Sequence, residues 1–232
     1  MPVFSRRSLL SLAAGGIVLA AGCDPGTLAY FILPEQRIPA KMRHLASEVK
    51  DKDPKVVILT WGGFEMRSEF IHADRQLSEM LAQYLRRQAE DNREKLTIIP
   101  ARKVEEFKSA NPNWRGMSLA DIGRRFGADH VIYLEVNSLS LYEPGSLNTL
   151  LRGRVSLNVT LADVRRPDDT PPQESFACTF PGDAPGALPA DNEAMKVQFR
   201  QAFLDHVARK LSLYFSKHGR SELRYMDRTP NG

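Results

Sequence analysis

The chain of 232 residues is poor in cysteine, because only Cys23 and Cys178 occur. So small a number leaves no room for a framework of disulfide bonds or for a zinc site built from clustered thiolates. The five histidines do not compensate, since no two of them stand at the spacing of metal ligands on a helix. Cys178 falls in a strand-like run at residues 175–180, where we expect a small buried side chain rather than a reactive thiol. The sequence therefore predicts neither a metal nor a cofactor.

The chain also lacks a strong excess of one charge and the signatures of common enzymes. Its formal net charge is +4, which falls to +2 without Arg6 and Arg7. Nucleic-acid binding needs clustered basic residues, so we expect no nucleic-acid partner. No Gly-x-Ser-x-Gly, His-Glu-x-x-His or phosphate-binding loop occurs, and Gly62-Gly63 is predicted to be a plain turn. We therefore predict no catalytic residue.

What the sequence does contain is an export signal at its amino terminus. Arg6 and Arg7 precede an uncharged run at residues 8–22, rich in Leu, Ala, Gly, Ile and Val, and Cys23 follows. A charged segment, a short apolar segment and small residues before a cleavage position form the pattern of a bacterial signal peptide. A cysteine directly after Ala-Ala-Gly resembles a lipoprotein signal, in which Cys23 is acylated with fatty acids such as palmitate and becomes the first mature residue.

Two other interpretations of this segment fit less well. The apolar run is shorter than the roughly 20 residues that a membrane-spanning helix needs. An ordinary secretory signal gives no reason for a cysteine to stand directly after the small residues. The Arg6-Arg7 pair also resembles a twin-arginine signal, which exports folded proteins, but any signal peptide needs positive charge here. Both export routes stay open.

Acylation of Cys23 has a physical consequence for where the protein resides. One acyl chain binds a bilayer only marginally, whereas several hold a protein there stably. We therefore expect a lipid anchor in the cell membrane, with the mature protein on the periplasmic side. Asp24 resembles the signal that retains lipoproteins in the inner membrane of enteric bacteria. That rule does not extend safely to other lineages, so the inner and the outer membrane both stay open.

Composition divides the chain into four parts. Pro34 and Pro39 interrupt regular structure after the signal, and a charged run ends at Pro54. The part that follows is long enough for one domain with a real core. The predicted parts are an export signal at 1–22, the acylated cysteine and a tether at 23–54, an α/β domain at 55–218 and a loose tail at 219–232.

Hydrophobic periodicity predicts the elements of the α/β domain. The β-branched run 56–61 indicates a strand buried on both faces, and helical spacing over 71–90 indicates a long helix. Alternation over 151–161 indicates an antiparallel strand with one core face, and a phase slip at Asn137-Ser138 indicates a β-bulge. The predicted order is β-α-β-(α)-α-β-β-β-α, which gives a single mixed-sheet α/β sandwich with helices packed on the sheet.

The segment Ser118–Ile132 supports a family resemblance. It predicts a helix that ends in Gly-Ala-Asp and leads into the strand Val-Ile-Tyr-Leu-Glu-Val. With the return strand 152–164, it resembles a group of bacterial envelope lipoproteins. The group contains the amino-terminal domain of the Tol–Pal translocation protein, the curli secretion lipoprotein and the lipoprotein activators of penicillin-binding proteins. The resemblance covers residues 55–217 and implies an α/β fold and an envelope role. It transfers no site, because the group shares no catalytic residues.

Two sets of residues are candidates for contact with a partner. Trp61 and Phe64 belong to an aromatic cluster in and after the first strand, which is either a binding patch or a seal of the core. Arg152 and Arg154 lie on the wetter face of the return strand, which is either a contact surface or a solvated face.

Other polar residues give weaker indications of chemistry. His130 beside Asp129 fits either a pH-sensitive pair or a structural strand end. Paired carboxylates can serve a glycosidase, but acids on loops and helix faces are far commoner. The acids near the end of the first strand are Glu65, Glu69, Asp74 and Glu79.

Three functional hypotheses follow. The favoured one is a membrane-anchored, non-enzymatic lipoprotein that binds an envelope protein partner in envelope assembly, secretion or cell-wall synthesis. The second is a hydrolase or transferase that acts on an envelope polymer. The third is a subunit of an outer-membrane secretion pore, which would need hairpins of about 9–11 residues per strand. The hairpin over 131–164 is long enough, but its apolar face is required for the core.

Overall fold

The computed structural model describes residues 37–47, 53–63, 70–182 and 186–219. They belong to a unit that begins at Arg37. The predictions for the export signal, Cys23 and Phe64 fall outside the described residues, as do those for Glu65, Glu69 and most of the tail.

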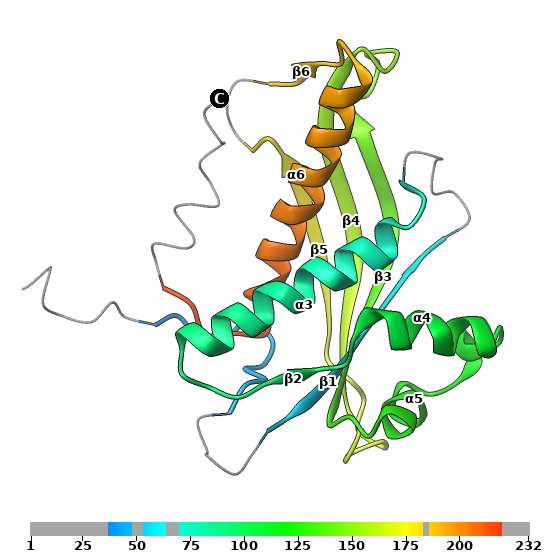
Figure 1. The fold of residues 1–232 in the computed structure, drawn as a ribbon, viewed down its shortest axis with the longest axis vertical. Helices are drawn as coiled ribbons and strands as arrows, with labels where there is room; N and C mark the ends of the chain where they lie inside the picture. Colours follow the sequence, from blue (N-terminus) through cyan, green and yellow to red (C-terminus); the bar gives the residue numbers. More distant parts are fainter. Residues whose placement is uncertain (1–36, 48–52, 64–69, 183–185, 220–232) are drawn as a thin grey trace, which may run out of the picture. The chain divides into compact units, whose positions relative to one another are not determined.

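Six strands in the described ranges form one mixed sheet, in the order β2-β1-β3-β4-β5 with β6 beside β4 (Figure 1). β1 runs parallel to β2 and β3, whereas β4 is antiparallel to β3, β5 and β6. Parallel neighbours need a long crossover, which the helices between β1 and β3 provide. The predicted α/β class and element order are confirmed. The elements are β1 (Lys55–Gly62), α3 (Ala73–Asp91), β2 (Thr97–Ile98), α4 (Ala101–Ala110), the 3₁₀ turn η2 (Trp114–Gly116), α5 (Leu119–Phe126), β3 (His130–Tyr142), β4 (Leu150–Asp163), β5 (Gln173–Phe180), β6 (Leu188–Pro189) and α6 (Glu193–Ser212).

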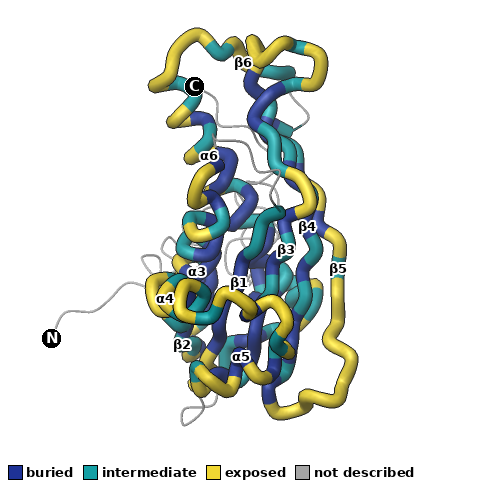
Figure 2. The backbone as a smooth tube through the Cα atoms, turned by 90° about the vertical axis from the view of Figure 1, so that its right-hand side faces the viewer, coloured by how far each residue is buried: buried dark blue, intermediate teal, exposed yellow. Residues whose placement is uncertain are grey.

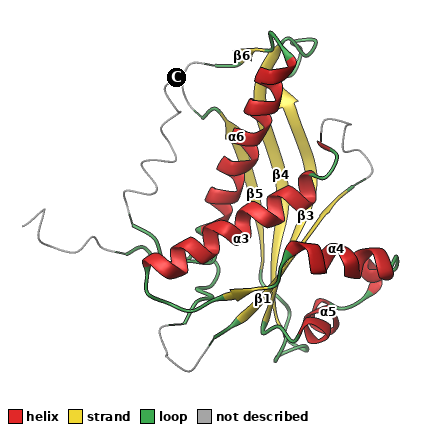
Figure 3. Cartoon of the chain, in the orientation of Figure 1, coloured by secondary structure: helices red, strands yellow, loops and turns green. Residues whose placement is uncertain are grey.

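Helices cover both faces of the sheet (Figure 3). Alternate residues of β1 point to opposite faces, as a strand requires. Val56 and Ile58 join the core beneath α3 and α6, whereas Val57 and Leu59 join a smaller core beneath α4 and α5. β1 is therefore buried on both faces, as its continuous apolar sequence predicts (Figure 2).

Local sequence signals place the ends of several elements. The side chain of Ser118 accepts a hydrogen bond from the backbone N–H of Asp121, at 3.0 Å, and so caps α5. Gly127 ends α5 in the left-handed conformation, with φ of 59°. The sheet register shifts between Val136 and Ser138, which confirms the predicted bulge. These features depend on neighbouring residues, which is why the sequence predicts them.

Two features differ from expectation. α6 ends at Ser212 rather than near Lys217, although Phe215 keeps the apolar spacing of the helix and is buried. In a helix that continued to Lys217, the N–H of Lys217 would donate to the carbonyl of Leu213. Instead, that carbonyl accepts from Lys41 and that N–H donates to His44, both of a distant segment. The second difference is the short strand β6, in a region predicted to be a loop. Its two residues pair with Leu150 and Leu151, and so brief a pairing leaves no periodic signal.

That distant segment is residues 37–47, which we name the strap. Its Met42 and Leu45 donate backbone hydrogen bonds to the carbonyls of Tyr214 and Phe215, at 2.9 and 3.0 Å. Leu45 is only 3% exposed and belongs to the larger core. The described part of the predicted tether therefore packs against the α/β domain.

Candidate functional site

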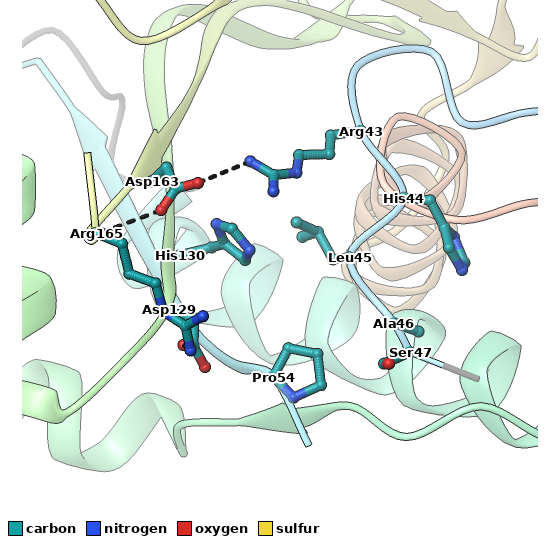
Figure 4. Close-up of a pocket in the computed structure, with 10 residues that line it drawn as sticks. All are labelled: Arg43, His44, Leu45, Ala46, Ser47, Pro54, Asp129, His130, Asp163 and Arg165. Carbon is teal, nitrogen blue, oxygen red and sulfur yellow. Dashed lines mark hydrogen bonds and ion pairs between the residues drawn. The ribbon is translucent and has the colours of Figure 1, made fainter. Parts of the chain in front are cut away.

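The strap closes one side of a cavity of about 130 Å³ at the start of β3 and the end of β4 (Figure 4). Strap residues 44–47 and Pro54 form part of its wall. Charged and polar side chains from three separate parts of the chain form the rest, namely Arg43, Asp129, His130, Asp163 and Arg165.

Asp163 is the most heavily hydrogen-bonded acid of this cavity. It accepts hydrogen bonds from Arg43 Nη1 at 3.0 Å, from Arg166 Nη2 at 3.1 Å and from the backbone N–H of Arg165 at 3.1 Å. Partial burial alone would raise the pKa of Asp163, but these donors outweigh it and lower the pKa to about 2. The carboxylate therefore stays charged at neutral pH.

Asp129 ties the beginnings of β1 and β3 together. Its carboxylate accepts the backbone N–H of Lys55 at 2.9 Å, and its own N–H donates to the carbonyl of Lys55 at 2.8 Å. The same carboxylate accepts a hydrogen bond from the Arg165 guanidinium. Burial would raise the pKa of Asp129, but the Lys55 N–H and Arg165 outweigh it and lower the pKa. Asp129 thus joins the starts of β1 and β3 and also lines the cavity.

His130 lies between these acids and the strap. It stands opposite Asp163 in the sheet register and is 9% exposed. Burial lowers the pKa of His130, and the nearby Arg43 guanidinium lowers it further. Its Nδ1 atom is buried and has no hydrogen-bond partner among the described residues. A neutral imidazole with an unpaired nitrogen therefore lines the cavity.

A second set of contacts fastens the strap on the other side. The backbone N–H of Lys217 donates to His44 Nδ1 at 3.2 Å, so His44 Nε2 carries the proton that it donates to Glu94 Oε1 at 2.9 Å. Lys217 Nζ lies 3.6 Å from the same oxygen. The His44 ring therefore points away from the cavity, as Figure 4 shows. Both of its nitrogens make hydrogen bonds that hold the strap in place.

A neighbouring cavity of about 210 Å³ shares Arg43 and Asp163 with the first one. Arg166, Thr170 and other residues of the turn after β4 line its remaining sides. The Arg43–Asp163 ion pair thus lines both spaces. No cluster of three or more His, Cys, Asp or Glu suited to a metal ion occurs in the described ranges.

The predicted contact residues occupy different places. Trp61 is half-buried against the smaller core, and the guanidinium carbon of Arg115 lies 5.1 Å from its ring centroid. Arg152 and Arg154 both reach Glu143, with N–O distances of 3.3 and 2.7 Å. The structure thus joins the two arginines through one carboxylate, whereas Trp61 lies beside Arg115 of η2.

The acids near β1 do not converge in the part of the chain that the structure describes. Glu79 pairs with Arg75 at 2.9 Å on the surface of α3. Asp74 lies 3.8 Å from Lys108 Nζ, which also bonds Glu105 and the carbonyl of Thr60. These two predicted acids therefore make separate ion pairs.

Sequence reasoning missed most of the strap cavity. The sequence points to Asp129 and His130, but Arg43 falls within the predicted tether and nothing singles out Arg165. Counting the hairpin register back from the bulge could have placed Asp163 opposite His130. No comparable signal marks Arg43, because its contacts join positions 120 residues apart.

Exposed apolar side chains gather at the other end of the fold. We name Leu147, Leu150, Leu188 and Val197 the hairpin end. They come from the β3–β4 turn, the start of β4, β6 and the start of α6, which lie together in Figures 1 and 2. Their exposed fractions are 93%, 37%, 43% and 62%. Single exposed apolar side chains are ordinary on protein surfaces, whereas a contiguous group of them marks a contact surface.

None of the helices in the described ranges is both long enough and apolar enough to span a membrane.

No family model matches the sequence, and no curated protein matches it. Among solved structures, lipoprotein GNA1162 from Neisseria meningitidis is 15% identical with a TM-score of 0.41, and the match covers 67% of this chain and 98% of that one. The PelC dodecamer from Paraburkholderia phytofirmans is 12% identical with a TM-score of 0.41, covering 80% and 99%. TolB from Acinetobacter baumannii is 11% identical with a TM-score of 0.30, covering 77% and 29%. Bacterial lipoproteins are thus among the structures that this chain is similar to, as the sequence led us to expect, and the similarity to TolB is weak.

Proposed function

We propose that this chain is a lipid-anchored, non-enzymatic protein of the bacterial cell envelope that binds a protein partner through the hairpin end. The observation that carries the proposal is the set of exposed apolar side chains there, led by Leu147 at the tip of the β3–β4 hairpin. Removing such side chains from water on binding is favourable in proportion to the apolar area buried.

The charges around the hairpin end favour a protein over a lipid surface as the occupant. Glu143 neutralises part of the charge of Arg152 and Arg154, and Lys196 pairs with Glu193 at 2.6 Å. An anionic bilayer would instead favour an excess of Lys and Arg around the apolar residues. Arg152 and Arg154 then serve as the polar rim of a protein interface.

The position of the strap supports the same function. The chain that follows Cys23 enters the described unit at the strap, which packs beyond the carboxyl end of α6. The hairpin end lies beside the amino end of the same helix. A helix of this length spans about 30 Å. The described unit therefore begins near one end of α6, and the hairpin end at the opposite end of that helix is the surface proposed for a partner in envelope assembly, secretion or cell-wall synthesis.

Site-specific photocrosslinking in the native host tests this proposal. A photoreactive residue at Leu147 or at Leu188 should give the same crosslinked protein, because the two positions lie on one surface. A matched probe at Arg102, an exposed residue of α4, should not give that product. Substitution of Leu147 by Asn should weaken the adduct formed from position 188.

The opposite pattern would reject the proposal. If Leu147 and Leu188 crosslink only to lipid, or give no product that Arg102 does not also give, the hairpin end is not a protein-binding surface. A probe at Trp61 tests the other predicted contact residue in the same experiment.

A further inference from the structure

We propose that the strap cavity is a binding site for a phosphate group, held by Arg43, Arg165 and His130. This site is separate from the hairpin end and does not depend on the function proposed for it.

The first argument is that the cavity offers more hydrogen-bond donors than acceptors. A guanidinium group has five N–H donors. Arg43 donates from Nη1 to Asp163, and Arg165 donates from Nη2 to Asp129. No acceptor within the described residues meets the other nitrogens of these two side chains, so most of their donors remain for a ligand.

The two carboxylates, in contrast, already have partners on both oxygens. One oxygen of Asp163 accepts from Arg43 and Arg166, and the other accepts the backbone N–H of Arg165. Asp129 accepts Lys55 N–H on one oxygen and Arg165 on the other. A ligand that only accepts hydrogen bonds therefore fits better than one that also donates. Phosphate oxygens accept strongly, and arginine binds them in a forked geometry.

The second argument is the unpaired nitrogen of His130. Buried polar atoms in proteins almost always have a partner, so each exception requires a protein group, a water or a ligand. Nδ1 of His130 has none among the described residues, although the side chain lines the cavity. The volume of about 130 Å³ is well above the roughly 10–15 Å³ that a single water molecule requires. A group of one phosphorus and four oxygens fits that space.

The charges around His130 determine how binding depends on pH. Three guanidinium groups, of Arg43, Arg165 and Arg166, surround two carboxylates, those of Asp129 and Asp163. A further carboxylate, Asp169, pairs with Arg166 at 3.5 Å but is exposed. The charges facing His130 are thus nearly balanced before a ligand binds. A bound anion shifts the balance towards negative charge and favours protonation of His130, so binding takes up a proton and tightens as the pH falls.

The same phosphate chemistry has two sources, free phosphate and the headgroup of a phospholipid. Arg165 is exposed at the mouth of the cavity and leaves an entry for either. A headgroup would bring acyl chains to the mouth, so a water-soluble short-chain phosphatidic acid can be compared directly with inorganic phosphate.

Histidine-selective NMR and calorimetry on the full chain in detergent test the site. Adding inorganic phosphate should move the His130 resonances and raise the pKa of His130, while the resonances of His72, an exposed residue, stay unchanged. Sulfate keeps its charge in this range, so tighter sulfate binding at about pH 6 than at about pH 8 reports the protonation of His130. A higher affinity for dihexanoyl phosphatidic acid than for phosphate identifies a headgroup site, and equal or lower affinity identifies a free-phosphate site.

Substitutions complete the test. Arg43→Met and Arg165→Met should each lower phosphate affinity about tenfold, since each removes charge-assisted hydrogen bonds. Arg102→Met removes an equal charge from α4 and should change nothing. Thermal melts identify any variant that fails to fold. If a variant does not fold, the phosphate titration of His130 in the wild type decides whether the site binds phosphate. The proposal is overturned if phosphate leaves His130 unmoved, which means that water alone fills the cavity, or if Arg102→Met weakens binding as much as Arg43→Met.

Discussion

A glycine in the middle of a strand usually weakens it, and Gly153 of β4 has a specific reason to be there. A side-chain carbon added at Gly153 would lie 2.5 Å from ring atoms of Phe203. Phe203 is fully buried on α6, so its ring cannot swing aside without disturbing the core. The close approach of α6 to β4 therefore depends on the absence of a side chain at position 153.

Gly153→Ala should lower the free energy of unfolding by about 1–3 kcal/mol, because overpacking forces the Phe203 ring or α6 to shift. Gly116→Ala is the matched control, since nothing lies within 4 Å of the carbon that it adds. Urea denaturation of the two variants measures both effects. Equal stability of the two variants would contradict the packing argument.

Asp163 makes a contribution to the stability of the fold that depends on pH. Its pKa in the folded protein, about 2, lies below its ordinary value of 3.8. A carboxyl with a lowered folded pKa adds stability above its unfolded pKa, and loses it as the pH falls through the folded value. The shift corresponds to about 2 kcal/mol at neutral pH, lost between about pH 4 and pH 2.

Asp163→Asn should therefore lower the free energy of unfolding by about 2 kcal/mol at pH 7, and the gap to the wild type should close towards about pH 2. Urea denaturation across this range measures the gap. Asp91→Asn, at the exposed end of α3, should stay within about 0.5 kcal/mol of the wild type throughout. A difference in the free energy of unfolding that does not change with pH would mean that Asp163 stabilises the fold through packing rather than through its charge.

At the scale of elements, the strap shows how far the sequence predicts this structure. Strands, long helices, the Ser118 cap and the bulge near Asn137 depend on residues close in sequence, and the sequence predicts them. The strap, β6 and the end of α6 depend on partners far along the chain, such as His218 for Ile38. The strap cavity also depends on contacts between distant positions, so the sequence points only to its part at Asp129 and His130.

Leu45→Ala should lower the free energy of unfolding by about 2–5 kcal/mol, because it removes a fully packed side chain from beneath the strap. Ile71→Ala changes an exposed side chain and should have an effect within about 0.5 kcal/mol. Thermal and urea denaturation measure both. A chain that begins at Lys55 should lose more stability than Leu45→Ala does, and equal stability of the chains from Arg37 and from Lys55 would show that the strap is only a tether.

At the scale of the whole molecule, the proposed function needs an attachment to the membrane and a surface that remains accessible. The strap and the hairpin end lie at opposite ends of α6, so the fold can provide both. The proposed attachment is an acylated Cys23, which lies outside the described residues. Several acyl chains on one residue would hold the protein stably.

Cys23→Ser should abolish incorporation of a palmitate analogue in the native host and move the protein out of the membrane fraction, because hydroxyl and thiol are not equivalent acceptors in this modification. Cys178→Ala is the matched control, since it removes the other cysteine, which lies buried on β5. The control should keep both the label and the membrane location. Metabolic labelling and fractionation measure the two properties independently. Label retained by Cys23→Ser, or lost from Cys178→Ala, would place the lipid elsewhere and remove the physical basis of the anchor.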